Sequence, residues 1–141
     1  MYKRILFIED ETAIAEIYAR TLNLHGFEVE CRYDGETGLD EALSNKYDLI
    51  LLDLMLPNKS GEEILRTLRN PDLSPQFDQT THIFMLTNFD LDDITKREIM
   101  TMAQQYLIKV DITPRVLADM LKQFNEQQPS GTSPSPSPTP A

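Results

Sequence analysis

Residues 47–61 read YDLILLDLMLPNKSG, and the rest of the chain is arranged around this stretch. The apolar run LILL at positions 49–52 is typical of a strand that is buried on both faces of a parallel sheet. Asp53 ends the run, and Pro57 stops the strand soon afterwards. We therefore expect Asp53 at the carboxyl end of a central strand, the end at which open α/β sheets carry their functional sites. Because burial of an unpartnered carboxylate is costly, Asp53 must reach water, a metal ion or a cation.

Apolar runs of strand length alternate with helical patterns along the chain. Gly26 is expected to end the first helix, and the second helix is expected to cover residues 35–45. Ser60 and Glu63 form a capping box that opens the third helix. The expected strands are residues 3–8, 27–33, 49–52, 82–87 and 106–109.

The fourth and fifth helices have candidate caps of their own. Asp90 is expected to cap the fourth helix, and Thr113 to cap the fifth, with Pro114 as its first helical residue. In four of the helices, apolar side chains at helical spacing are expected to face the core. They are Ile14, Ile17, Tyr18 and Leu22 in the first helix, Ile64, Leu65 and Leu68 in the third, Leu91, Ile94, Met102 and Ala103 in the fourth, and Val116, Leu117, Met120, Leu121 and Phe124 in the fifth.

This alternation predicts an α/β fold in which helices cover both faces of a doubly wound, five-stranded parallel sheet. The flavodoxin-like strand order 2-1-3-4-5 places a crevice between the first and third strands, at their carboxyl ends. Glu9 and Asp10 follow the first strand there, and Asp53 ends the third. Three carboxylates in one crevice repel one another unless a divalent cation binds between them. Mg²⁺ suits these oxygen ligands best, and Mn²⁺ is the alternative.

The fourth and fifth strands end in two further polar side chains. Thr87 offers a hydroxyl donor, and Lys109 a cation that pairs with a carboxylate or a phosphoryl oxygen. Taken alone, each is more often a solvated residue at a strand end than a ligand. Together with a metal ion and the carboxylate of Asp53, they supply what a phosphoryl transfer to that carboxylate needs.

The composition restricts the class of partner. The chain has 141 residues, enough for one ordinary domain core, and its formal net charge is -10. This excess of acids disfavours binding to DNA or to an anionic membrane surface. The single cysteine, Cys31, excludes an internal disulfide and suits a reducing compartment. The start MYKRILFIEDE is neither a signal peptide nor a membrane span, so a cytoplasmic location is expected.

Two segments depart from the alternating pattern. Residues 70–81 form a connection with two prolines and no clear period. This connection should lie at the sheet edge opposite Asp53, as a surface insertion or as a partner-binding loop. Residues 127–141 are rich in proline, serine and threonine and have no large apolar side chain, so a disordered tail is expected after a domain at 1–126.

In its pattern of acids, hydroxyl and lysine, the chain resembles the receiver domains of bacterial two-component response regulators, in particular single-domain regulators of the chemotaxis type. The likeness covers residues 1–126. The matching positions are the acid pair Glu9-Asp10, the phospho-accepting aspartate Asp53 in DLMLP, the switch hydroxyl Thr87, the switch aromatic Tyr106 and the lysine Lys109. The resemblance implies that Asp53, Thr87 and Lys109 are the catalytic residues. The implied metal ligands are Glu9, Asp10, Asp53 and the main-chain carbonyl of Met55.

The resemblance also implies a function. A histidine kinase or a histidine phosphotransfer protein would supply a phosphoryl group to Asp53 in the presence of Mg²⁺. The domain would catalyse this phosphorylation and its own dephosphorylation, rather than a metabolic reaction. Movements of Thr87 and Tyr106 would then change the binding of a downstream protein at the fourth helix, fifth strand and fifth helix.

Two further expectations concern assembly and output. Gln104 and Gln105 stand where DNA-binding relatives often carry acids that mediate dimerisation. We therefore expect a monomer or a weak dimer. Only a helix end and the proline-rich tail follow Phe124, so we expect a single-domain receiver with no DNA binding by this chain.

Three positions depart from the family pattern. Val110 follows Lys109, where the family usually has a proline in a cis peptide. Asn88 is larger than the residue usual after Thr87, and Met102 replaces a common glycine. Val110 and Asn88 leave open a second hypothesis, a degenerate receiver that binds its partner independently of phosphorylation. No chemical group of the site is missing, however, which favours the phosphorylated receiver.

Two other protein classes are disfavoured. A haloacid-dehalogenase-type phosphatase needs a second aspartate two residues after the nucleophile, where this chain has Met55. An FMN protein of the flavodoxin type needs a phosphate-binding loop after the first strand, where the acids at positions 9–11 would repel phosphate. Met55 and Phe89, both apolar, offer no group that orients water toward a phosphorylated aspartate, so slow autodephosphorylation is expected.

Overall fold

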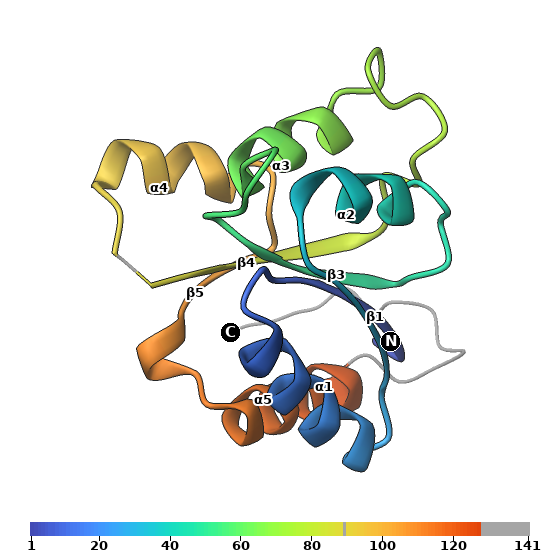
Figure 1. Cartoon of the computed structure of the whole chain (residues 1–141), viewed down its shortest axis with the longest axis vertical. Coiled ribbons are helices and arrows are strands. Elements are labelled where there is room, and N and C mark those ends of the chain that lie inside the picture. Colours follow the sequence, from blue (N-terminus) through green and yellow to red (C-terminus); the bar gives the residue numbers. More distant parts are fainter. Residues whose placement is uncertain (89, 128–141) are drawn as a thin grey trace.

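The computed structural model describes residues 1–88 and 90–127 and shows five parallel strands in the order β2-β1-β3-β4-β5 (Figure 1). This confirms the predicted sheet and its flavodoxin-like order. The strands are β1 (Arg4–Ile8), β2 (Glu28–Arg32), β3 (Leu49–Asp53), β4 (His82–Thr87) and β5 (Gln105–Ile108). The helices are α1 (Thr12–Leu24), α2 (Gly35–Ala42), α3 (Gly61–Arg69), α4 (Asp93–Met100) and α5 (Pro114–Gln127), with a short 3-10 helix η1 (Lys109–Asp111) after β5. Phe89 and the predicted tail, apart from Gln127, lie outside the described residues.

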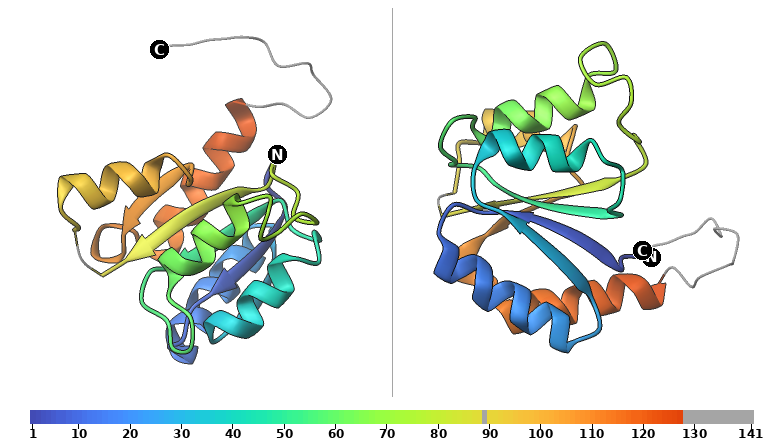
Figure 2. Two further views of the ribbon diagram at one scale, coloured as in Figure 1. Left: turned by 90° about the horizontal axis from the view of Figure 1, so that it is seen from above. Right: turned by 45° about the vertical axis from the view of Figure 1, so that its right-hand side comes forward.

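The sheet separates two layers of helices. Helices α1 and α5 cover one face, and α2, α3 and α4 cover the other (Figure 1, Figure 2). Side chains alternate between the faces along each strand, so Phe7 and Leu51 belong to the core beneath α1 and α5. Ile8 and Leu52 belong to the core on the opposite face. All residues of β3 are buried, as expected of a strand with a helix layer on each side.

The predicted starts of α3 and α5 are confirmed. The Ser60 hydroxyl oxygen accepts a hydrogen bond from the Glu63 N–H at 3.2 Å and so caps α3. At α5 the Thr113 hydroxyl oxygen accepts one from the Val116 N–H at 3.2 Å, just before Pro114. The side chains predicted to face inward from α3 are fully buried: Ile64, Leu65 and Leu68. Among the described helices, none is long and apolar enough to cross a lipid bilayer.

The cap of α4 differs from the prediction. Asp92, not Asp90, is the N-cap, because its carboxylate accepts hydrogen bonds from the Thr95 N–H at 2.8 Å and from the Thr95 hydroxyl at 2.9 Å. Asp90 instead forms an ion pair with Lys96 at 2.6 Å. Both aspartates precede an apolar pattern, but only Asp92 stands three residues before a free helical N–H that it can reach.

Helix α4 is also shorter than the apolar pattern suggested. Leu91 lies before the helix, and Met102 and Ala103 lie after its last residue, Met100. The side chain of Ile94, predicted to face the core, is 72% exposed. Leu91, Met102 and Ala103 do pack against the core as predicted, but they do so from the two connections and not from the helix.

Other element boundaries and helix faces differ from the predictions by a few positions. Ile17 and Val116 are exposed because the buried stripes run through neighbouring positions of α1 and α5. Helix α2 ends at Ala42 rather than at residue 45, since Asn45 takes a left-handed backbone conformation with φ 59°. Strand β5 ends at Ile108, so Lys109 belongs to η1 and not to the strand.

Residues 70–81 are packed more closely than the predicted surface insertion. Phe77 is only 5% exposed and belongs to the core beneath α2, α3 and α4. Arg69, the last residue of α3, donates hydrogen bonds to the carbonyls of Gln79 at 3.2 Å and Thr81 at 2.9 Å. Most positions of the segment are exposed, as expected of a surface insertion, but one apolar side chain anchors it to the core. Its place at the amino end of β4 is as expected.

The half-buried imidazole of His82 should make stability depend on pH. Its Nδ1 lies 2.6 Å from the Tyr2 hydroxyl. Burial lowers the pKa of His82, and the positive charge of Arg69 adds to this effect. An unfolded chain with an ordinary histidine pKa of about 6.5 binds more protons, so the free energy of unfolding should fall as the pH drops below that value. Urea denaturation at about pH 7.5 and about pH 5.5 measures this fall, which should be smaller in His82→Asn. An equal fall in both proteins would contradict this account.

Candidate functional site

Four strands bring their carboxyl ends to one edge of the sheet. The parallel register sets Thr87 of β4 beside Ile108 of β5, and it pairs Ile8 of β1 with Leu52 of β3, so that Glu9 and Asp53 come next on neighbouring strands. This edge contains the switch point between β1 and β3, where the chain turns toward opposite faces. Glu9, Asp53 and Thr87 are buried there, whereas Asp10 is exposed.

The structure brings together the three carboxylates that were singled out in the sequence. One carboxylate oxygen from each of Glu9, Asp10 and Asp53 lies within 4.8 Å of the other two. Oxygen ligands at this spacing suit a small, hard cation, and the exposed Asp10 leaves one side open to the water molecules that Mg²⁺ retains. The residues present therefore fit a magnesium ion.

Lys109 lies against two of these carboxylates. Its Nζ donates a hydrogen bond to Glu9 Oε1 and another, at 3.1 Å, to Asp53 Oδ2. The side chain is only 8% exposed. Burial works against the charged ammonium, but the hydrogen bond to Glu9 and the negative charge of Asp53 outweigh it and raise the pKa of Lys109. The ammonium is therefore held in its charged form.

Glu9 is the most enclosed acid of the cluster. Burial raises the pKa of Glu9 to about 7, and the negative charge of Asp53 adds to that effect, whereas the hydrogen bond from Lys109 opposes it. The second carboxylate oxygen, Oε2, accepts a hydrogen bond from the Glu11 N–H at 3.1 Å. Glu9 is thus fixed by contacts at both of its oxygens.

Backbone contacts fix Asp53 as well. The Met55 N–H donates a hydrogen bond to Asp53 Oδ1 at 3.2 Å. A Cβ on Gly61 would lie 2.0 Å from the Asp53 carbonyl oxygen, so only glycine allows α3 to start so close to the end of β3. The sequence reasoning missed this role of Gly61. The signal that could have found it is a glycine at the first helical position, directly after the cap Ser60.

The two predicted switch residues lie on neighbouring strands. Thr87 is fully buried at the end of β4. Tyr106, on β5, is half-buried, and its hydroxyl oxygen accepts a hydrogen bond from the Leu91 N–H at 2.9 Å. The Lys96 ammonium lies 5.4 Å from the centre of the Tyr106 ring. These contacts hold the ring beside α4.

Two apolar side chains border the site at the surface. Met55 is 60% exposed and Val110 is 80% exposed. The peptide bond between Lys109 and Val110 is trans, as are all peptide bonds in the described ranges. Phe89, the second apolar residue expected to flank the site, lies outside the described residues.

The sequence of this domain matches a known family along most of its length. Residues 5–122 match the family described as the response regulator receiver domain. The chain belongs to this receiver family. The match runs from β1 into α5 and so includes all of the site residues described above.

Curated relatives of this receiver include the response regulator ArlR from several staphylococci. ArlR of Staphylococcus saprophyticus is 46% identical over 84 residues, which cover 60% of this chain and 35% of the relative. ArlR of Staphylococcus haemolyticus is 48% identical over 71 residues, or 50% of this chain and 32% of the relative. The receiver therefore spans about a third of the length of the relatives that it matches.

Solved structures of receiver domains resemble this one closely. A CheY-like receiver domain protein from Methanospirillum hungatei superimposes with a TM-score of 0.71 at 27% identity, covering 91% of this chain and 97% of the other. The BeF3-activated N-terminal receiver domain of RstA from Klebsiella pneumoniae gives 0.71 at 30% identity, covering 86% and 97%. The chemotaxis protein CheY4 of Vibrio cholerae gives 0.71 at 27% identity, covering 87% and 98%.

Removal of the Lys109 charge should destabilise this receiver. In Lys109→Met, Glu9 and Asp53 lose their shared cation while both stay buried, so the free energy of unfolding should fall by about 3 kcal/mol in metal-free buffer near pH 8. Urea denaturation measures the change. The matched control is Lys96→Met, which removes a lysine from an ion pair with the exposed Asp90 and should have only a small effect. Equal losses in the two variants would contradict a buried, paired Lys109.

Proposed function

We propose that this receiver accepts a phosphoryl group on Asp53 from a histidine kinase or a histidine phosphotransfer protein in the cytoplasm. Phosphorylation would then change its binding to a downstream protein. The observation that carries the proposal is the position of the Asp53 carboxylate, next to two other acids and 3.1 Å from the ammonium of Lys109. A nucleophilic carboxylate, a site for a divalent cation and a fixed positive charge together suit phosphoryl transfer.

In the proposed reaction, an oxygen of Asp53 attacks the phosphorus of the donor's phosphohistidine. A phosphorus–oxygen bond forms while the phosphorus–nitrogen bond breaks, and the electron pair of that bond returns to the donor's imidazole. The Lys109 ammonium pairs with one phosphoryl oxygen, and the Thr87 hydroxyl donates a hydrogen bond to another. When bound, Mg²⁺ neutralises negative charge on these oxygens. Its proposed ligands are the carboxylates of Glu9, Asp10 and Asp53 and the main-chain carbonyl of Met55.

The proposed output is a change at α4, β5 and α5. If the Thr87 hydroxyl moves toward a phosphoryl oxygen, it leaves space near the end of β4 into which the Tyr106 ring can turn. That movement requires the ring to give up its hydrogen bond with the Leu91 N–H and its contact with Lys96. Phosphorylation would therefore shift an existing equilibrium between two positions of the ring, and a downstream protein would bind one of them.

A degenerate receiver that binds its partner without phosphorylation is the second candidate. The observation that favours it is the exposed Val110 beside Lys109, where the family usually has proline. The presence of Asp53, Thr87 and Lys109 at the ends of the strands supports the phosphorylated receiver instead.

We also propose a monomer or a weak dimer, with residues 1–126 as the receiver domain. Gln104 is one of the two residues that replace the usual acids of a dimer interface. Its side-chain oxygen accepts hydrogen bonds from the Ile83 N–H at 2.7 Å and from Arg69 at 3.2 Å. It is therefore engaged within the domain, which supports weak association. The single-domain organisation and the absence of DNA binding stay predictions from the sequence.

Intact-protein mass spectrometry tests the phosphorylation of Asp53. Incubation with Mg²⁺ and acetyl phosphate should add the mass of one phosphoryl group to the wild type. Asp53→Asn should gain none, because an amide is not a nucleophile at phosphorus. The matched control, Asp119→Asn, alters an exposed aspartate on α5 and should be phosphorylated like the wild type. A folded wild type without an adduct would favour the degenerate receiver.

The phosphorylated receiver should lose its phosphoryl group slowly. Met55 is exposed beside Asp53 and has no polar group that could orient an attacking water molecule. Met55→Asn adds an amide at that position and should shorten the lifetime, whereas Met55→Leu should leave it unchanged. The decay of the phosphorylated mass over time measures these lifetimes. A wild type that decays as fast as Met55→Asn would argue against this role of Met55.

A further inference from the structure

The turn between β2 and α2 lies against the loop that follows Asp53. This loop, residues 54–60, joins β3 to α3. The Gly35 N–H donates a hydrogen bond to the Pro57 carbonyl at 3.2 Å. A Cβ on Gly35 would lie 2.0 Å from the Lys59 carbonyl oxygen and 2.7 Å from the Lys59 Cβ, closer than real Cβ atoms approach. Because Gly35 does not have a left-handed backbone, this contact alone excludes other residues.

Asp34 adds a second link between the turn and the loop. Its carboxylate caps α2 by accepting hydrogen bonds from the Thr37 N–H at 2.9 Å and the Thr37 hydroxyl at 3.0 Å. These contacts lower the pKa of Asp34, and a hydrogen bond from the Asn58 side chain adds to the effect. Asn58 itself has φ 70°, a conformation that is uncommon outside glycine. The turn therefore touches three successive residues of the loop, 57–59.

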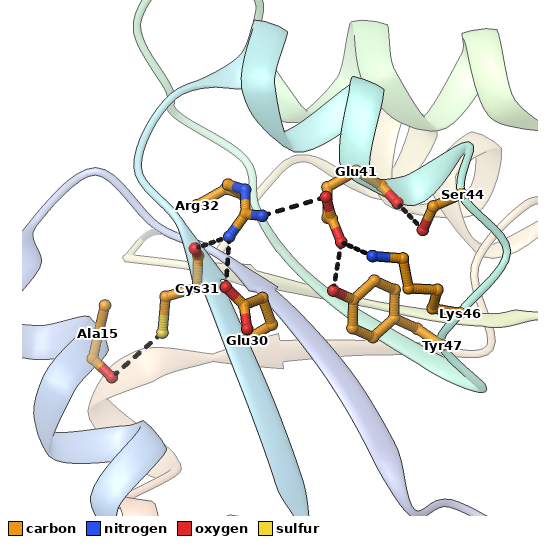
Figure 3. Close-up of polar contacts among 8 residues, drawn as sticks. All are labelled: Ala15, Glu30, Cys31, Arg32, Glu41, Ser44, Lys46 and Tyr47. Carbon is orange, nitrogen blue, oxygen red and sulfur yellow. Dashed lines mark hydrogen bonds and ion pairs between the residues drawn. The ribbon is translucent and has the colours of Figure 1, made fainter.

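A polar network fixes the turn with respect to the sheet (Figure 3). Arg32 ends β2, Glu41 lies in the last turn of α2, and Tyr47 precedes β3. The Glu41 carboxylate accepts hydrogen bonds from Arg32 at 3.1 Å and from the Tyr47 hydroxyl at 2.5 Å. These contacts hold the strand before the turn and the helix after it. Because the turn is held in place, a larger side chain at Gly35 would have to be accommodated by movement of the loop and not of the turn.

The other end of the loop contacts the Asp53 carboxylate, because the Met55 N–H donates a hydrogen bond to Asp53 Oδ1. We propose that the Asp34–Gly35 turn is a positioning element for the Asp53 site. By holding the loop at residues 57–59, it holds the Met55 backbone beside Asp53 and sets the geometry in which Mg²⁺ binds. This inference rests on the proposed function, from which it takes the metal site.

Isothermal titration calorimetry of the full chain with Mg²⁺ tests this positioning role. In Gly35→Ala the loop must move away from the new methyl group, so Mg²⁺ should bind about 10- to 100-fold more weakly than to the wild type. The matched control is Gly26→Ala, which places a methyl group on a residue with φ 96° and no atom within 4 Å. It strains the backbone between α1 and β2 but leaves the loop alone, so its Mg²⁺ affinity should equal that of the wild type.

A second variant, Asn58→Gly, separates positioning from stability. Glycine adopts φ 70° without strain, so the melting temperature should equal or exceed that of the wild type. The variant loses the Asn58 side chain that interacts with Asp34, so the turn holds the loop less firmly and the Mg²⁺ affinity should fall. A turn with only a structural role would not give weaker binding in a protein that is at least as stable. If Gly35→Ala does not fold, the Mg²⁺ affinity of Asn58→Gly tests the positioning role instead.

The outcomes distinguish this inference from the proposed function. Wild-type Mg²⁺ affinity in a folded Gly35→Ala would overturn the positioning role and leave the proposed function intact. The same holds for wild-type affinity in Asn58→Gly if Gly35→Ala does not fold. A wild type that neither binds Mg²⁺ nor accepts a phosphoryl group would overturn the proposed function, and the positioning role with it.

Discussion

Two buried carboxylates share one ammonium at the carboxyl edge of the sheet, and the geometry of the site depends on that pairing. Glu9 and Asp53 are almost completely buried, so each would be costly as an isolated anion. Lys109 reaches both of them, although β3 and β4 separate β5 from β1, a span of about 14 Å at the usual strand spacing. It can do so because it lies in η1, beyond the end of β5, where the backbone has left the strand direction.

The charge at this edge is still unbalanced after the pairing. Three carboxylates meet a single ammonium, and burial and repulsion raise the pKa of Glu9 to about 7. A divalent cation would relieve the excess negative charge, and a phosphoryl group would bring negative charge that both the cation and Lys109 attract. The exposed Asp10 lies on the side from which either could enter. The receiver family and the electrostatics of the site thus point to the same chemistry.

Backbone contacts connect this charged edge to both ends of the helix layer on one face of the sheet. On one side, the start of α3 lies against Asp53 at Gly61, and the loop after β3 lies against the β2–α2 turn at Gly35. On the other side, Tyr106 is held beside α4 through the Leu91 N–H. A change of charge at Asp53 would therefore act on two groups of contacts. The first holds the loop and the start of α3 beside Asp53, and the second holds Tyr106 beside α4.

Local patterns in the sequence were enough to identify the strands and the positions of Asp53 and Thr87 at strand ends, whereas the strand order was assumed from the doubly wound fold class. Strand periodicity is a property of neighbouring residues, and alternating strands and helices leave few topologies to choose from. Spacing alone did not identify the cap of α4, because two nearby aspartates are equally plausible caps in the sequence. It also did not predict the burial of Phe77, because a single aromatic residue forms no periodic pattern. The contact between Gly35 and the Lys59 carbonyl, and the bond between Lys109 and Glu9, join residues that are distant in the chain. Such contacts depend on how α2 and η1 pack over the sheet, and only the folded domain establishes them.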